Sequence, residues 1–142
     1  MFTGIIEEVT PTISKERQPL SIDFMSTHPD NYPLLAESPE MVKEIELLEI
    51  PCRDIEVSYI PKEKIGLYGC KEIKVGDIIA ITTSIPGLDV AHIGFAYYNN
   101  GTLCLLHASS NKGKVIKDTT PLSDYLANNK RHTGIRVFRA CF

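Results

Sequence analysis

The sequence predicts an α+β domain whose sheet is antiparallel and curved, or forms a partial barrel, with one longer and one short helix. Three observations predict this fold: a helix with a clear start and end, several segments in which apolar and polar residues alternate, and an Asn-Gly turn between two apolar runs. The elements follow in the order helix, antiparallel strands, short helix and final strand, which is typical of an α+β domain.

The 142 residues are expected to form a single domain, because a chain of this length can bury its own core. Prolines interrupt residues 1–36, so we expect an irregular N-terminal segment there. Residues 37–142 are expected to hold the helix and the sheet.

The longer helix has both of its boundaries marked in the sequence. Ser38 is a good N-cap, Pro39 suits the first turn, and Pro51 ends the helix. The apolar residues between these boundaries form one stripe that we expect to lie in the core, namely Met41, Val42, Ile45 and Leu48.

The strands are recognised by alternation or by runs of branched and aromatic residues. They are expected over residues 55–59, 78–83, 91–98, 102–107 and 134–140, with a short extended piece from Val115. A short second helix is expected between this extended piece and the strand at 134–140. Thr120 would be its cap, Pro121 would lie in its first turn, and it would end at Asn128 or Asn129.

One hairpin carries the two histidines on which the functional interpretation depends. Asn100-Gly101 predicts a two-residue turn, because both central residues of such a turn need positive φ. The resulting register places His92 and His107 on the same face as diagonal neighbours, with Gly94 opposite His107. A one-residue slip would separate the two histidines onto opposite faces.

Two histidines on one face can serve as a general base and the group that orients it. They can also contribute to a metal site, with Asp89 nearby, or they can be two ordinary polar residues on a solvent-facing side. Spacing alone leaves these alternatives open.

Composition argues against several classes of protein. The formal net charge is −3 and no basic stripe with interleaved aromatic residues is present, which disfavours nucleic-acid binding. No apolar run approaches the roughly 20 residues needed to span a bilayer. The first residues also lack the pattern of a signal peptide, so the sequence alone leaves the localisation undetermined.

The four cysteines, Cys52, Cys70, Cys104 and Cys141, form no C-x-x-C pair and have no zinc-finger spacing. We expect them to be unpaired and mostly buried, with Cys104 pointing away from the histidine face.

Motifs along nearly the whole chain, from about Ile5 to Arg139, resemble the NlpC-type cell-wall cysteine peptidases, and more closely their N-acetylmuramoyl-L-alanine-amidase-like branch. The motifs that carry the resemblance are FMSTHPDNYPLL, YIPKEKI, GDIIAITT, GLDVAHIG, LLHASSNKGKV, LSDYL and GIRVFR. The resemblance implies a papain-like fold, of which this chain would be the C-terminal half, and a bacterial enzyme acting on peptidoglycan peptides. It also suggests an exported or periplasmic protein.

In that family the base paired with a catalytic cysteine corresponds to His92, and the orienting residue on the next strand corresponds to His107. Asp89, Gly94 and Ser109 flank this pair and are the expected substrate-binding residues. The resemblance implies no cofactor and no resident metal, and it makes a peptidoglycan-derived peptide the expected partner.

The nucleophilic cysteine of the family lies upstream of the histidines at the start of a helix, where the helix dipole lowers its pKa. Cys52 follows the end of a helix, Cys70 lies in a turn near the 78–83 strand, and Cys141 comes after both histidines. We therefore expect the nucleophile to be absent and the chain to be a truncated or degenerate relative that is inactive alone. The alternatives are a non-enzymatic module that binds cell-wall peptides and a metal site on His92 and His107.

The lack of an N-terminal portion would also remove cover from the sheet. We expect an uncovered apolar strip, drawn from Ile79, Ile81, Ile93 and Phe95. The chain should then self-associate through this strip, exchange elements between copies, or refold residues 1–33 as a substitute cover, and we expect self-association first.

Overall fold

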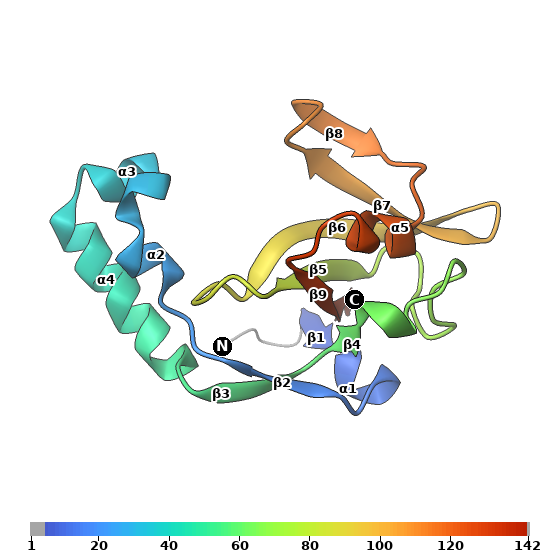
Figure 1. Ribbon diagram of the computed structural model, residues 1–142, viewed down its shortest axis with the longest axis horizontal. Helices are drawn as coiled ribbons and strands as arrows, with labels where there is room; N and C mark the ends of the chain where they lie inside the picture. Colours follow the sequence, from blue (N-terminus) through green and yellow to red (C-terminus); the bar gives the residue numbers. More distant parts are fainter. Residues whose placement is uncertain (1–4, 142) are drawn as a thin grey trace.

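The structure is a computed structural model that describes residues 5–141 (Figure 1). The strands are β1 (Ile6–Glu8), β2 (Arg17–Leu20), β3 (Ile55–Ser58), β4 (Ile60–Pro61), β5 (Ile78–Thr83), β6 (Val90–Asn99), β7 (Thr102–Ser109), β8 (Lys114–Lys117) and β9 (His132–Ala140). The α-helices are α1 (Thr10–Ile13), α2 (Phe24–Thr27), α3 (Pro33–Ala36), α4 (Pro39–Glu49) and α5 (Leu122–Ala127), and the 3-10 helices are η1 (Pro29–Asn31), η2 (Ile50–Cys52) and η3 (Lys62–Lys64).

Most strands join one large antiparallel sheet. Its strands lie in the order β1-β9-β5-β6-β7-β8, with β4 paired beside β1 on β9, and a separate two-stranded sheet joins β2 to β3. The large sheet ends at β1 and β8 and does not close into a barrel. The predicted α+β class with a mainly antiparallel sheet is therefore confirmed.

The predicted hairpin forms between β6 and β7. Asn100 and Gly101 both have positive φ, at 48° and 84°, as the two-residue turn requires. The register pairs Asn99 with Thr102 and Ala96 with Leu105, as the sequence predicts. This register decides which side chains face the core and which face outward.

The core lies on one face of the large sheet. Side chains from its central strands are fully buried there, and Leu122 and Leu126 of α5 pack against them. Burying each such side chain contributes about 1.5–3 kcal/mol. The fully buried strand residues of this cluster include Ile79, Ile81, Leu103, Ile135 and Val137.

The opposite face of the sheet is partly uncovered. Ile93 and Phe95 of β6 are 55% and 48% exposed, whereas Ile79 and Ile81 of β5 are fully buried. The predicted strip therefore divides between two faces, because Ile79 and Ile81 point to the core and Ile93 and Phe95 point away from it. We call this side of the sheet the outer face; it carries the exposed residues Ile93, Phe95, Leu106 and Val115 and the half-buried residues Ile78 and Phe138.

Residues 5–36 are more regular than the sequence predicts, and residues 1–4 of the predicted irregular segment lie outside the described residues. β1 pairs with residues 138–140 and β2 pairs with β3. Both partners are distant in the sequence, so local periodicity gives no sign of these strands.

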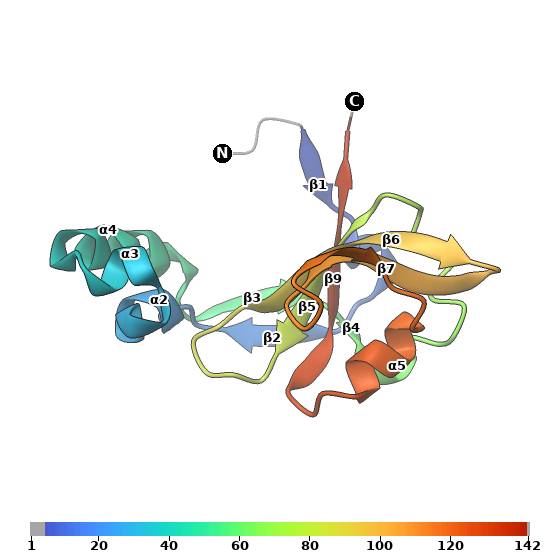
Figure 2. The same cartoon turned by 90° about the horizontal axis from the view of Figure 1, so that it is seen from above.

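The helices α2, α3 and α4 lie together away from the large sheet, and the β2–β3 ribbon leads to them (Figure 2). The predicted start of α4 is confirmed, since the Ser38 hydroxyl accepts a hydrogen bond from the Met41 amide at 3.3 Å. The predicted core stripe is wrong, because Met41 and Leu48 are 44% and 71% exposed. The helix instead buries Glu49, whose Oε1 accepts hydrogen bonds from the Met25 and Ser26 amides in the first turn of α2.

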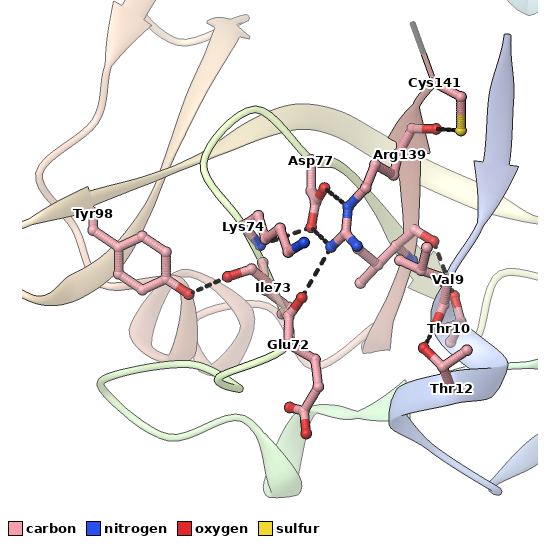
Figure 3. A network of polar contacts seen from close by, with 11 residues as sticks. Val9, Thr10, Thr12, Glu72, Ile73, Lys74, Asp77, Tyr98, Arg139 and Cys141 are labelled. Carbon is pink, nitrogen blue, oxygen red and sulfur yellow. Dashed lines mark hydrogen bonds and ion pairs between the residues drawn. The ribbon is translucent and has the colours of Figure 1, made fainter.

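A buried ion pair fastens β9 to the start of β5 (Figure 3). The Arg139 guanidinium donates from Nε to Oδ1 and from Nη2 to Oδ2 of Asp77, both at 2.8 Å, and Asp77 is 2% exposed. Asp77 also accepts from the Lys74 amide at 2.7 Å, and Arg139 donates to the Glu72 carbonyl at 2.9 Å. These contacts position the C-terminal part of β9 against the start of β5.

Candidate active site

His92 and His107 contact each other directly. His92 lies on β6 and His107 on β7, and Nε2 of His92 lies 2.7 Å from Nδ1 of His107. Their rings are perpendicular, with centroids 4.8 Å apart. Gly94 makes this approach possible, because a Cβ added there would lie 3.1 Å from the His107 Cβ. The structure thus brings the two histidines together on the core-facing side of the sheet.

Asp118 extends the pair into a chain of three polar groups. It follows β8, and its Oδ2 lies 3.4 Å from Nε2 of His107. Its Oδ1 accepts a hydrogen bond from the Thr120 amide at 2.9 Å. Burial alone would raise the pKa of the Asp118 carboxyl, but hydrogen bonds from Thr120 and His107 outweigh burial and hold that pKa below its usual value. Asp118 is therefore an anion at neutral pH and can orient His107.

One arrangement of protons satisfies this chain with both imidazoles neutral. His107 then donates from Nε2 to Asp118 and accepts at Nδ1 from the Nε2–H of His92. The second nitrogen of His92, Nδ1, keeps its lone pair, and it has no hydrogen-bond partner among residues 5–141. A neutral imidazole with one free lone pair is the form that a general base needs.

Burial lowers the pKa of His92, and the charges of His107 and His132 lower it further. The same effect of burial lowers the pKa of His132, which is 7% exposed. Neutral His92 is therefore favoured at neutral pH, in agreement with the proton arrangement above.

Tyr125 of α5 packs its ring against all three of these histidines. Its ring centroid lies 6.2 Å from that of His92, 5.5 Å from that of His107 and 5.9 Å from that of His132. Burial raises the pKa of the Tyr125 hydroxyl, so the ring is neutral. Tyr125 holds the imidazoles between the sheet and α5 and limits their rotation.

A cavity of about 350 Å³ opens beside the histidine pair. His92, His107, Asp118 and Tyr125 form one part of its wall, and the turn between β7 and β8 forms the other. This turn closes when the Lys112 and Gly113 amides donate to the Ser109 carbonyl. The side chains of both histidines therefore border open space.

The expected substrate-binding residues take different positions. Ser109 lines this cavity. Gly94 does not line it and instead lies beneath His107, where it borders a shallow apolar groove on the outer face. Asp89 lies in the loop before β6 and lines neither. Among residues 5–141, no group of three or more His, Cys, Asp or Glu side chains is placed to hold a metal ion.

In the described residues, no cysteine sulfur is hydrogen-bonded to His92 or His107. In the described part of the chain, the hydrogen bonds of cysteine sulfur atoms go to carbonyls of Leu48, Thr119 and Arg139. Cys104 is fully buried, as predicted, but Cys52 and Cys70 are half-buried and Cys141 is exposed, so the expectation that most of the cysteines are buried is wrong. Burial raises the pKa of the Cys104 and Cys70 thiols. A raised pKa opposes formation of the reactive thiolate.

The sequence interpretation missed Asp118, Tyr125 and His132. Asp118 follows the extended piece that starts near Val115, and its position beside His107 follows from the pairing of Leu106 with Lys117. A prediction of that pairing would have pointed to the carboxylate. His132 carries no comparable signal, because it reaches the site only through the position of β9.

None of the helices among residues 5–141 has the length and apolar composition that crossing a bilayer requires.

Comparison with protein families gives a match over residues 2–135 to the family described as AmiA-like, N-acetylmuramoyl-L-alanine amidase-like. The comparison with curated proteins finds no match.

Solved structures give matches over most of this chain. An N-acetylmuramoyl-L-alanine amidase from Bacteroides uniformis superposes with a TM-score of 0.94 at 47% identity, over 98% of this chain and 59% of that chain. A protein from Bacteroides fragilis, named as a proposed xylanase, superposes with a TM-score of 0.89 at 49% identity, over 94% of this chain and 58% of that chain. The protein LPG0564 from Legionella pneumophila shares the fold, with a TM-score of 0.59 at 22% identity over 98% of this chain and 57% of that chain. This chain therefore spans less than two thirds of the length of these structures.

Proposed function

Because this chain belongs to the AmiA-like family of N-acetylmuramoyl-L-alanine amidase-like proteins, we propose that it supplies the base and its orienting group to an enzyme that cleaves amide bonds of peptidoglycan peptides. The observation that carries this proposal is the ordered chain from His92 through His107 to Asp118. Its free end, Nδ1 of His92, is the atom that exchanges protons with the reacting groups.

The reaction we propose is acyl transfer through a cysteine nucleophile of the NlpC type, on a papain-like framework. The thiol transfers its proton to Nδ1 of His92, and the thiolate sulfur forms a bond to the carbonyl carbon of the substrate. The carbon–nitrogen bond then breaks, and His92 returns the proton to the leaving amine. Water hydrolyses the resulting thioester with His92 again accepting a proton, which restores the thiol.

The nucleophile in this proposal comes from outside residues 5–141. Raised thiol pKa values oppose a catalytic role for Cys70 and Cys104, and the Cys52 and Cys141 sulfurs bind backbone carbonyls away from the histidines. The chain alone is then inactive in hydrolysis, although its site can still bind the substrate. An exported or periplasmic location, where peptidoglycan lies, is part of the proposal.

The xylanase name of the Bacteroides fragilis protein does not favour a second function for this chain. Glycoside hydrolysis generally uses two carboxyl groups about 5–10 Å apart. Asp118 is the acidic residue that lines the cavity, and both of its oxygens already accept hydrogen bonds. The pair of histidines suits proton transfer in amide hydrolysis better.

A chimera tests the proposed function. Residues 5–141 replace the matching part of the Bacteroides uniformis amidase, which is feasible at 47% identity and a TM-score of 0.94. We expect the chimera to release new amino groups from peptidoglycan, and we expect His92→Ala in the chimera to lower the rate by at least about 100-fold, the effect of removing a general base. The chain alone should release none.

His28→Ala is the matched control, because His28 is an exposed histidine whose ring contacts Phe24 and Thr27 in the helical region. That variant should retain the activity of the chimera. A chimera that folds, judged by its circular dichroism and thermal transition, but is inactive where the parent amidase is active would refute the proposed function. Hydrolysis by the chain alone that depends on His92 would refute the position of the nucleophile.

A further inference from the structure

The cavity beside His107 has a wall that the proposed proton transfer does not use. This wall is the turn between β7 and β8, which contributes Ser109, Ser110, Asn111 and Lys112. A cavity of about 350 Å³ lies at the small end of ligand sites, which span roughly 300–1,000 Å³. It has room for one or two amino-acid residues next to the bond that His92 would act on.

Lys112 supplies an uncompensated positive charge to this wall. The ion pairs among residues 5–141 join other partners, and none includes Lys112. An anionic group is therefore attracted to this end of the cavity.

The carboxylate in the cavity wall, that of Asp118, already has hydrogen-bond partners. Asp118 directs one oxygen to the Thr120 amide and the other to His107, so its charge is concentrated beside these two groups. The hydroxyl of Ser109 accepts a hydrogen bond from the Lys112 amide at 3.3 Å, which leaves its own proton free to be donated. The turn that lines the cavity thus offers a hydroxyl donor and a lysine, which are partners that a carboxylate can use.

We propose that this cavity is a carboxylate-binding subsite, in which Lys112 selects substrates that carry a free carboxylate close to the scissile amide. The inference rests on the proposed function for the position of the scissile bond, but the binding of the carboxylate is independent of hydrolysis. Lys112 is a specificity-determining residue and takes no part in proton transfer.

A pair of small probes tests the subsite on the chain as it exists. N-acetyl-L-alanyl-L-alanine carries a carboxylate, and N-acetyl-L-alanyl-L-alaninamide has the same shape without the charge. Each is titrated at millimolar concentration while the imidazole signals of His92 and His107 are followed by NMR. We expect the acid to bind about tenfold more tightly than the amide, the ratio that one charge-assisted hydrogen bond provides.

Two lysine variants test whether Lys112 causes the preference for the acid over the amide. In Lys112→Gln the preference for the acid should largely disappear, whereas in Lys114→Gln, which changes a lysine that does not line the cavity, it should remain. Added salt should weaken binding of the acid and leave binding of the amide unchanged.

Equal binding of both probes in the parent chain, or a preference that survives Lys112→Gln, overturns the subsite while leaving the proposed function intact. The absence of any effect of either probe on the imidazole signals also overturns the subsite, and the chimera then decides the proposed function separately.

Discussion

Nε2 of His92 lies 2.7 Å from Nδ1 of His107, so each imidazole is oriented by the other across two neighbouring strands. The two ends of this pair differ. Asp118 accepts a hydrogen bond from Nε2 of His107, whereas nothing among residues 5–141 is hydrogen-bonded to Nδ1 of His92. His92 is thereby kept in the form with a proton on Nε2.

Removing His107 should raise the pKa of His92. Burial and the charge of His107 both lower that pKa. The variant His107→Ala reduces the burial of His92 and removes the charge. The tautomer of His92 should also become mixed, because Nε2–H loses its acceptor. Both changes are read from the nitrogen and carbon-bound proton signals of His92 in an NMR pH titration. An unchanged titration in a folded variant would mean that His107 does not orient His92.

The folded chain should lose stability as the pH falls below about 6.5, the ordinary histidine pKa. His92 and His132 have lowered pKa values in the folded state, chiefly through burial, so the unfolded chain binds more protons in the interval below 6.5. Their contribution is fully present above that pH and is lost as the pH falls towards the folded-state values. Melting temperatures at a series of pH values measure the loss. His92→Gln and His132→Gln should each flatten the dependence.

Asp77→Ala should destabilise the fold strongly. It leaves the partly buried Arg139 guanidinium without its carboxylate, and removing one member of a buried pair costs about 3–5 kcal/mol (Figure 3). Urea unfolding measures the change. The matched control is Glu16→Ala, which breaks the exposed pair with Lys64 and should cost less than about 1 kcal/mol. Equal effects of the two variants would contradict this assignment.

Gly134→Ala should also destabilise the fold, for a steric reason. A Cβ at Gly134 would lie 2.1 Å from the Ile60 carbonyl oxygen, so β4 would have to move away from β9, at a cost of about 1–3 kcal/mol. Gly66→Ala provides the comparison, because nothing lies within 4 Å of the added carbon there. If chemical denaturation gives both variants the same stability, the close approach of β4 does not require glycine.

The outer face should cause self-association. A row of cross-strand partners crosses it, with Phe138, Ile78, Phe95 and Leu106 side by side between Glu8 at one end and Lys117 at the other. Glu8 is already paired with Arg136, so the apolar centre of the row is the part that a copy related by a two-fold axis would cover. We expect sedimentation to detect dimers and Phe95→Lys to abolish them. Tyr68→Lys changes a residue that is 70% exposed outside this row and should have no effect; a parent chain that is monomeric at high concentration would refute the interface.

Local signals in the sequence predicted the hairpin and therefore the histidine pair. The Asn100-Gly101 turn sets the register between residues 95–99 and 102–106, and extending that register placed His92 and His107 together without knowledge of the rest of the fold. Asp118 could not be placed in this way, because its position depends on the turn from residue 110 to 113, whose geometry has no comparable signature.

The helix α4 shows a different limit of sequence patterns. Its boundaries follow from Ser38 and Pro51, and both are close to the predicted positions. The buried side of the helix is decided by α2, to which Glu49 is bound through two amides. Hydrophobic periodicity predicts that the apolar side of the helix is buried. In this helix the buried residue is instead Glu49, whose carboxylate caps α2.

The position of β9 has a consequence for synthesis of the protein. This strand contains the last residues of the described chain to enter the sheet, yet it lies in the interior of the sheet and is the partner of β1, β4 and β5. A ribosome that has made the chain only as far as α5 exposes three strands that lack this neighbour. Ribosomes add about 5–20 residues per second, so these strand edges stay unprotected for a period that a chaperone could cover.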